Sequence, residues 1–138
     1  MNEAIDYSTV KWVKQELDAT LKQARQALEA YVETPADDAQ LRFCAVHLHQ
    51  VYGTLQMVEL YGAALLAEEM EHVVEALIAD SVGQRQEAYE LVMRGILQLP
   101  DYLERLVAGH RDIPLVLLPL LIDLRAIRGQ KLLSDNSL

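Results

Sequence analysis

Apolar residues recur at three- and four-residue steps along nearly the whole chain, the spacing that gathers them on one face of an α-helix. The first such run begins near Ser8 or Thr9, either of which can cap a helix, and ends before Thr34-Pro35. Its apolar positions are Val10, Val13, Leu17, Leu21, Ala24, Leu28 and Val32. No segment shows the alternation of a β-strand. The pattern therefore predicts a long amphipathic helix that ends at a turn.

Three more helices are predicted to follow, joined by short connections. The segment 34–38 supplies a stop, a turn and an N-cap, so the second helix starts directly after it. This helix is expected to break near Gly62, where the phase of its apolar stripe changes. The third is expected over 63–78 and the fourth over 86–108, kinked at Pro100. The central stripe of the second helix holds Leu41, Ala45, Leu48, Tyr52 and Leu55.

A leucine-rich segment after Gly109 predicts a fifth helix. Asp112 can cap it, Pro114 is tolerated in its first turn, and Pro119 should bend it. We expect this helix to close the bundle. If exposed, the run 115–121 would instead be a dimer surface or the contact to a following domain.

These elements predict an all-α fold, an antiparallel four-helix bundle of phosphotransfer type with an additional C-terminal helix. A single domain is expected over residues 1–133, with 134–138 as the start of a linker to the next domain of a longer parent protein. A chain of 138 residues is long enough to bury a core of its own.

Composition narrows the function classes. The net charge of −9 argues against a nucleic-acid surface or an anionic membrane surface, both of which attract clustered Lys and Arg. One cysteine, Cys44, cannot form an internal disulfide and fits a reducing compartment. No signal peptide is apparent, and the most apolar run, 113–122, is too short to span a bilayer. A cytoplasmic protein without membrane insertion is expected.

The second helix carries the most informative residue, His49. At about 100° per residue, His49 falls at the edge of the apolar stripe, between core and solvent, on the same side as Arg42, Gly53 and Gln56. Gly53 costs roughly 1 kcal/mol of helix propensity relative to alanine, and it leaves bare backbone beside the imidazole. Another molecule can therefore approach the ring closely. On spacing alone, the simpler interpretation is a partly exposed histidine without a role.

The segment around His49 resembles the histidine phosphotransfer (HPt) motif His-x-x-Lys-Gly-x-x-x-x-hydrophobic-Gly. His49 matches the phosphoacceptor, Gly53 the first glycine and Val58 the hydrophobic position. In CheA-type chemotaxis kinases, a Met-Glu pair about 22 residues after the histidine supplies a glutamate that hydrogen-bonds the imidazole. Met70-Glu71 stands at that offset here. The resemblance thus implies that His49 is the phosphoacceptor and that Glu71 orients its ring.

Two positions depart from this motif. Tyr52 replaces the lysine that offsets phosphate charge, and Glu59 replaces the final glycine, which would place a carboxylate where it repels phosphate if it faces the site. Two functions therefore stay open. One is a phosphotransfer module that uses His49. The other is a degenerate HPt fold that docks a receiver domain or a pilus-pole protein without phosphate chemistry. The candidate partner-binding residues are Arg42, Tyr52, Gly53, Gln56 and Glu59.

The resemblance extends over nearly the whole chain. Segments 7–33, 53–59, 61–71 and 117–121 resemble, in order, the N-terminal domain of type IV pilus chemosensory hybrid histidine kinases of the ChpA/PilL type; a related domain occurs in the scaffold protein FimL. This family implies control of type IV pili and twitching motility. The implied partners are CheY-like receiver domains, the CheA-like kinase core of the same parent and pilus-pole scaffold proteins. It implies no cofactor here, with magnesium on the partner receiver, and no kinase activity in this chain, which lacks the catalytic core.

A metal site is a third possibility. Residues 69–72 contain Glu-x-x-His, the spacing of di-iron carboxylate bundles, but such sites need a second pair and no other occurs in the chain. The carboxylates of 68–71 are therefore interpreted as a solvated face. His47 is interpreted as a surface or packing residue. The methionines Met57, Met70 and Met93 are interpreted as core residues.

Overall fold

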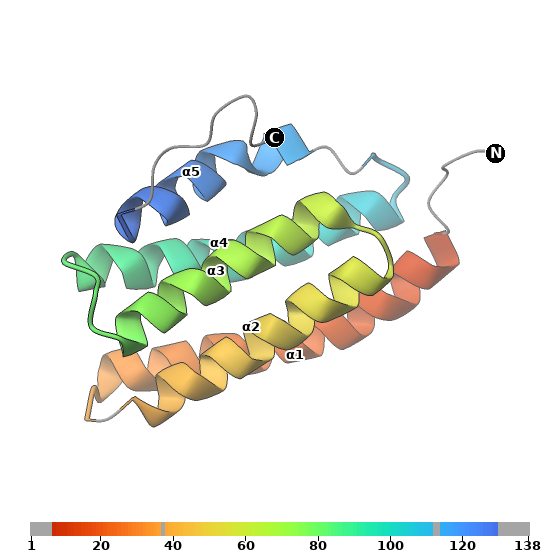
Figure 1. The fold of residues 1–138 in the computed structure, drawn as a ribbon. Coiled ribbons are helices and arrows are strands. Elements are labelled where there is room, and N and C mark those ends of the chain that lie inside the picture. Colours follow the sequence, from red (N-terminus) through yellow and green to blue (C-terminus); the bar gives the residue numbers. More distant parts are fainter. Residues whose placement is uncertain (1–6, 37, 112–113, 130–138) are drawn as a thin grey trace.

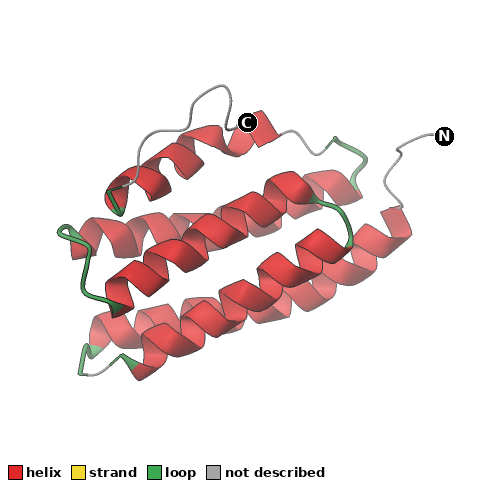
Figure 2. Cartoon of the chain, viewed as in Figure 1, coloured by secondary structure: helices red, strands yellow, loops and turns green. Residues whose placement is uncertain are grey.

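The computed structural model describes residues 7–36, 38–111 and 114–129, and all its regular elements are helical (Figure 2). These are α1 (Tyr7–Glu33), α2 (Ala39–Met57), α3 (Tyr61–Ile78), α4 (Arg85–Val107), the 3₁₀ turn η1 (Pro114–Leu117) and α5 (Leu118–Ile127). Consecutive helices run antiparallel, and α5 lies over α3 and α4 (Figure 1). The predicted all-α bundle with an additional C-terminal helix is confirmed. No strand occurs among the described residues.

The four long helices close into a ring in which each one packs on two others. α1 contacts α2 and α4, and α3 contacts the same two helices, so one core runs along the bundle axis. Among the described elements, α2 packs only on α1 and α3. α5 packs on α3, α4 and η1, and η1 also packs on α3. One side of α2 therefore remains uncovered by any described element (Figure 1).

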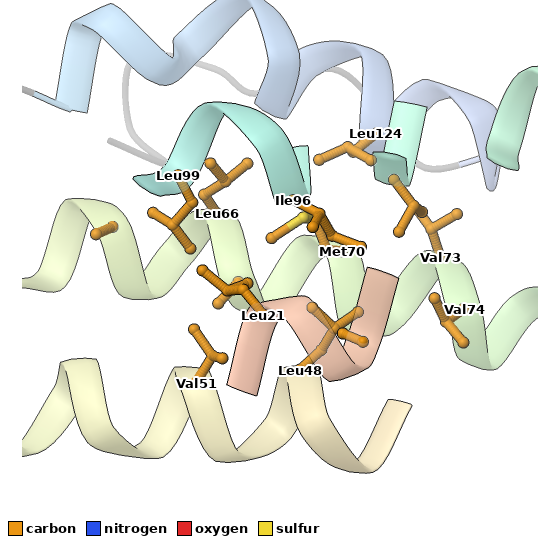
Figure 3. Close-up of a cluster of buried hydrophobic side chains, with 14 of the residues drawn as sticks. Leu21, Leu48, Val51, Leu66, Met70, Val73, Val74, Ile96, Leu99 and Leu124 are labelled. Carbon is orange, nitrogen blue, oxygen red and sulfur yellow. The ribbon is translucent and has the colours of Figure 1, made fainter. Parts of the chain in front are cut away.

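The core follows the predicted apolar stripes closely. Figure 3 shows side chains from all five α-helices meeting there, among them Leu21, Leu48, Met70, Leu99 and Leu124. Every position predicted for the stripe of α1 is buried except Val32, which is 40% exposed near the end of the helix. Burial of this apolar surface is the main stabilising term, at roughly 25 cal/mol per Å².

Three helices end with the same backbone arrangement. After α2, the amide of Glu59 donates to the Gln56 carbonyl and that of Leu60 to the Leu55 carbonyl, at 3.0 and 2.9 Å. This pair of bonds defines the Schellman motif, which needs a left-handed residue after the C-cap. Glu59 has φ 64°. The equivalent residues after α3 and α4 are Asp80 at φ 57° and Gly109 at φ 100°.

Two predicted helix boundaries are wrong. The break after α2 lies at 58–60 rather than near Gly62, which is buried inside α3, because the left-handed Glu59 already reverses the chain. The α-helical part of the predicted fifth segment begins at Leu118, because the 3₁₀ turn η1 precedes it. Pro119 sits in the first turn of α5, where the missing amide hydrogen costs no bond. The predicted cap Asp112 and the linker 134–138 lie outside the described residues.

The last helix is fixed by charge as well as by packing. Leu117, Leu120 and Leu121 are buried, as expected for a helix that closes the bundle, whereas Leu115 and Val116 are exposed. Glu69 of α3, also buried, accepts hydrogen bonds from two arginines of the C-terminal segment, Arg125 and Arg128, each at 3.0 Å. Among the helices that the structure describes, none has the length and apolarity to span a membrane.

Candidate functional site

His49 projects from the edge of α2 with 66% of its side chain exposed. Its Nδ1 lies 3.1 Å from Oε1 of Glu71 on the adjacent helix α3. An ionised carboxylate only accepts hydrogen bonds, so Nδ1 carries the hydrogen in this contact. In the neutral ring, the lone pair is then on Nε2. The arrangement holds the imidazole in the tautomer whose Nε2 can act as a nucleophile or bind a donor.

Glu71 is much less accessible than its partner, with 13% of its side chain exposed. Burial raises the pKa of Glu71 above its usual value, because a charged carboxylate loses hydration there. The hydrogen bond and charge of His49 oppose this shift, and the neighbouring Glu75 adds to it. Glu71 is thus a carboxylate whose charged form is costly and is favoured by its hydrogen bond with the histidine.

Tyr52 packs half-buried against the core, beside the histidine ring, with the two ring centroids 6.0 Å apart. Its hydroxyl accepts a hydrogen bond of 2.8 Å from Nε2 of Gln56. The position that is lysine in the phosphotransfer motif therefore supplies no positive charge here. Tyr52 and Gln56 instead form a polar pair one to two turns from His49.

Gly53 lies one turn after His49 and has open space where a side chain would begin. A Cβ added there would meet no heavy atom within 4 Å. Internal packing therefore does not require glycine at this position. The open space leaves the backbone of α2 accessible to another molecule beside the imidazole.

Arg42 and Glu59 lie at the two ends of α2. Arg42 donates from Nη2 to Oδ2 of Asp38, at 3.0 Å. It precedes His49 by seven residues, about 10 Å along a helix axis. Glu59 follows His49 by ten residues and lies in the turn after the helix. Its place is therefore set by the end of α2, and its role beside the histidine stays a prediction.

Comparison with known proteins identifies the family of this chain. Residues 7–117 match the FimL C-terminal domain family. The chain belongs to this family. It is 30% identical over 129 residues to the scaffold protein FimL of Pseudomonas aeruginosa strain PAO1. That match covers 94% of this chain and 23% of FimL, so the chain spans about a quarter of its relative's length. No solved structure matches significantly.

The matched relative is described as a scaffold protein, and that description belongs to FimL itself. The expected kinase parent of the ChpA/PilL type and the phosphotransfer activity stay predictions, as do the roles assigned to His49 and Glu71.

The structure places two further residues: His47, interpreted as a surface or packing residue, and Met57, interpreted as a core residue. His47 is buried, its ring nitrogens 2.8 Å from the Phe43 carbonyl and 2.7 Å from Oε1 of Gln23, so it is a packing residue between α1 and α2. Met57, expected in the core, is 84% exposed on the far side of α2. The helical angle of Met57, about 180° from Leu48, was a signal that could have shown this.

The two residues of the alternative metal site, Glu69 and His72, have other partners in the structure. Glu69, expected on a solvated face, is buried and occupied by its two arginines. His72 Nδ1 lies 3.4 Å from Arg128 Nη2. Among the described residues, no group of three or more His, Cys, Asp or Glu side chains is arranged to hold a metal ion. The Glu-x-x-His pair of α3 is thus engaged with cationic partners.

Proposed function

We propose that this chain is a protein-docking module of a FimL-type scaffold in type IV pilus signalling, with a CheY-like receiver domain as its partner. The observation that carries the proposal is the family membership of residues 7–117, together with the 30% identity to a scaffold protein. The partner would cover the surface around His49. Arg42, Gly53 and Gln56 lie on that side of α2, and Tyr52 borders it.

The surroundings of His49 favour docking over group transfer. The described contacts of its ring are with Glu71 and Tyr52, and neither brings a positive charge that would balance an arriving phosphoryl group. Arg42 precedes His49 on α2 and is positively charged, but it is already paired with Asp38. A receiver could bind this surface through shape and hydrogen bonding without transferring its phosphate.

A second function, phosphotransfer at His49, is supported by one observation, the hydrogen bond from Nδ1 to Glu71. The free Nε2 would attack the phosphorus of a receiver's aspartyl phosphate. The bond from phosphorus to the aspartyl oxygen would break, and the aspartate would leave as carboxylate. Glu71 would stabilise the imidazolium that forms. The magnesium ion that this chemistry uses would belong to the receiver.

One experiment separates the two functions. The 138-residue chain and its His49→Ala variant are incubated with a CheY-like receiver, unphosphorylated and phosphorylated, and both complex formation and label transfer are measured. Docking predicts a complex with the receiver, no label on the chain, and binding largely retained in His49→Ala. Label that is acid-labile, base-stable and absent from His49→Ala would establish phosphotransfer instead. Absence of both complex and label would reject the receiver as partner.

The matched control uses the buried histidine of the same helix. His47→Gln keeps hydrogen-bonding groups beside Gln23 and leaves His49 in place. Loss of label in His49→Ala but not in His47→Gln would assign the chemistry to His49. Equal loss in both variants would point to disturbance of α2 as a whole.

A further inference from the structure

The uncovered side of α2 carries a row of residues at helix-packing intervals, three of them exposed apolar side chains and one, Gln50 at its centre, polar. We call this row the α2 stripe; its members follow one another at steps of three and four residues and are Phe43, Val46, Gln50, Gly53 and Met57. Phe43, Val46 and Met57 are 52%, 53% and 84% exposed. The α2 stripe spans about 21 Å, close to four helical turns. Its alternating 3–4 spacing is that of a helix packed along a second helix.

Charge distinguishes this helix from the rest of the chain. α2 has no Asp or Glu in its 19 residues, whereas the other four α-helices each have at least one. In a chain of net charge −9, this gives one surface where desolvation of carboxylates would not oppose contact. Apolar, acid-free surface of this length is typical of an interface.

A row of carboxylates borders α2 on the side of α3. Glu68, Glu71 and Glu75 follow each other on α3 at steps of three and four residues, and we call them the α3 carboxylate row. The contact of Glu71 with His49 places this row along the α2 edge. On the other side α1 presents Gln23, which reaches His47. The α3 flank of the α2 stripe thus carries a row of carboxylates.

We infer that the α2 stripe docks an amphipathic helix of a partner protein whose apolar row packs on Phe43, Val46 and Met57, and whose Lys or Arg residues face the α3 carboxylate row. This inference rests on the proposed docking function and names the chemistry of the partner segment. Gly53, one turn before the end of the stripe, lets the partner backbone come close, since a Cβ there would meet no atom of the chain within 4 Å. The carboxylate row selects a basic flank and orients the incoming helix.

The test uses two labelled peptides of about 21 residues, six helical turns. Both carry leucines at 3–4 spacing; one has lysines at the flanking positions and the other has glutamates. Each is titrated with the 138-residue chain, and binding is followed by fluorescence anisotropy. We expect the lysine peptide to bind at least about tenfold more tightly than the glutamate peptide, a difference that shrinks with added salt. Equal affinities, or no binding of either peptide, would overturn the inference.

Paired variants locate the site. The double variant Val46→Ser with Met57→Ser should bind the lysine peptide at least about tenfold more weakly. Leu97→Ser with Leu115→Ser, which also removes two exposed apolar side chains, should leave it unchanged. Glu68→Gln with Glu75→Gln should reduce the preference for lysine, and Glu87→Gln with Glu90→Gln on α4 should not. If the α2 variants bind the peptides as well as the unmodified chain does, the α2 stripe is not the peptide site and the inference is rejected. If the chain self-associates through the stripe, the α2 variants abolish this association and no peptide binds, the stripe contacts a second copy instead of a basic partner helix.

Receiver binding is measured on the same variants, so that the two proposals fail separately. A receiver that binds equally well after Val46→Ser with Met57→Ser would leave the docking function standing and reject the α2 stripe as its contact. A lysine peptide that binds the stripe while no receiver binds would retain the stripe and reject the receiver as partner.

Discussion

His49 on α2 and Glu71 on α3 are joined by a hydrogen bond of 3.1 Å across a sequence separation of 22 residues. The bond links an exposed ring to a largely buried carboxylate, so each residue constrains the other. Glu71 sets which ring nitrogen is free, and His49 is the one described partner that lowers the cost of the Glu71 charge. Any chemistry or binding at the ring therefore depends on the charge state of Glu71.

The raised pKa of Glu71 leads to a pH-dependent stability. Because folding raises this pKa above its unfolded value near 4.5, the folded state holds the proton more tightly, and stability is lost as pH rises from about 4.5 through the folded pKa. Glu71→Gln removes the charge and keeps an acceptor for His49. We expect it to raise the free energy of unfolding at pH 7 relative to the unmodified chain, and less so at pH 4, in urea denaturation.

The control for this prediction is Glu33→Gln, which removes an exposed carboxylate at the end of α1, far along the chain from His49. It corrects for the change in net charge alone. If Glu71→Gln were no more stabilising at pH 7 than at pH 4 after this correction, burial would not be the dominant influence on Glu71.

The same substitution at two glycines should have opposite effects. Gly53→Ala meets open space and should stabilise the chain by roughly 1 kcal/mol through helix propensity. Gly95→Ala would place its Cβ against Met70, which is fully buried and cannot swing into solvent. We expect a net loss of about 1–3 kcal/mol from this overpacking. Chemical denaturation of both variants measures the difference; a stabilising Gly95→Ala would mean that Met70 repacks freely.

Left-handed residues after α2 and α3 offer a second stability test. Glu59 and Asp80 adopt φ values of 64° and 57°, which cost a residue with a Cβ roughly 1 kcal/mol. Glu59→Gly and Asp80→Gly should therefore each raise the free energy of unfolding by up to about 1 kcal/mol. Gly109→Ala, at the equivalent position after α4, should lower it. Thermal unfolding of the three variants would contradict this account if all shifted in the same direction.

Periodicity was sufficient to predict the bundle. Leu17, Leu48 and Leu99 are buried as their spacing predicts. A 3.6-residue repeat puts the apolar side chains on one face of each helix, and this face is buried when the helices pack together. It failed at the end of α2. Glu59 has a side chain that disfavours the left-handed conformation, so no local signal marked the turn that the tertiary structure imposes there.

The candidate site was predicted less completely. The offset between His49 and Glu71 came from a family motif, and the structure brings those two residues together. The run of carboxylates at 68–71 predicts a solvated face, because such runs are usually exposed, yet Glu69 is buried. Its burial depends on Arg125 and Arg128, more than 50 residues away, and single-sequence spacing carries no information about such partners.

That long-range cluster supports the last prediction. Glu69 is 3% exposed and binds Arg125 and Arg128, whose side chains keep 25% and 17% exposure. Glu69→Ala leaves two arginines facing a buried cavity, so we expect a loss of about 3 kcal/mol, the lower end for a broken buried pair. Hydrogen exchange should show α5 losing protection before the four long helices. Glu104→Ala, which breaks the exposed Lys14 pair, should cost less than about 1 kcal/mol. Equal losses in the two variants would mean that Glu69 does not hold α5 on the bundle.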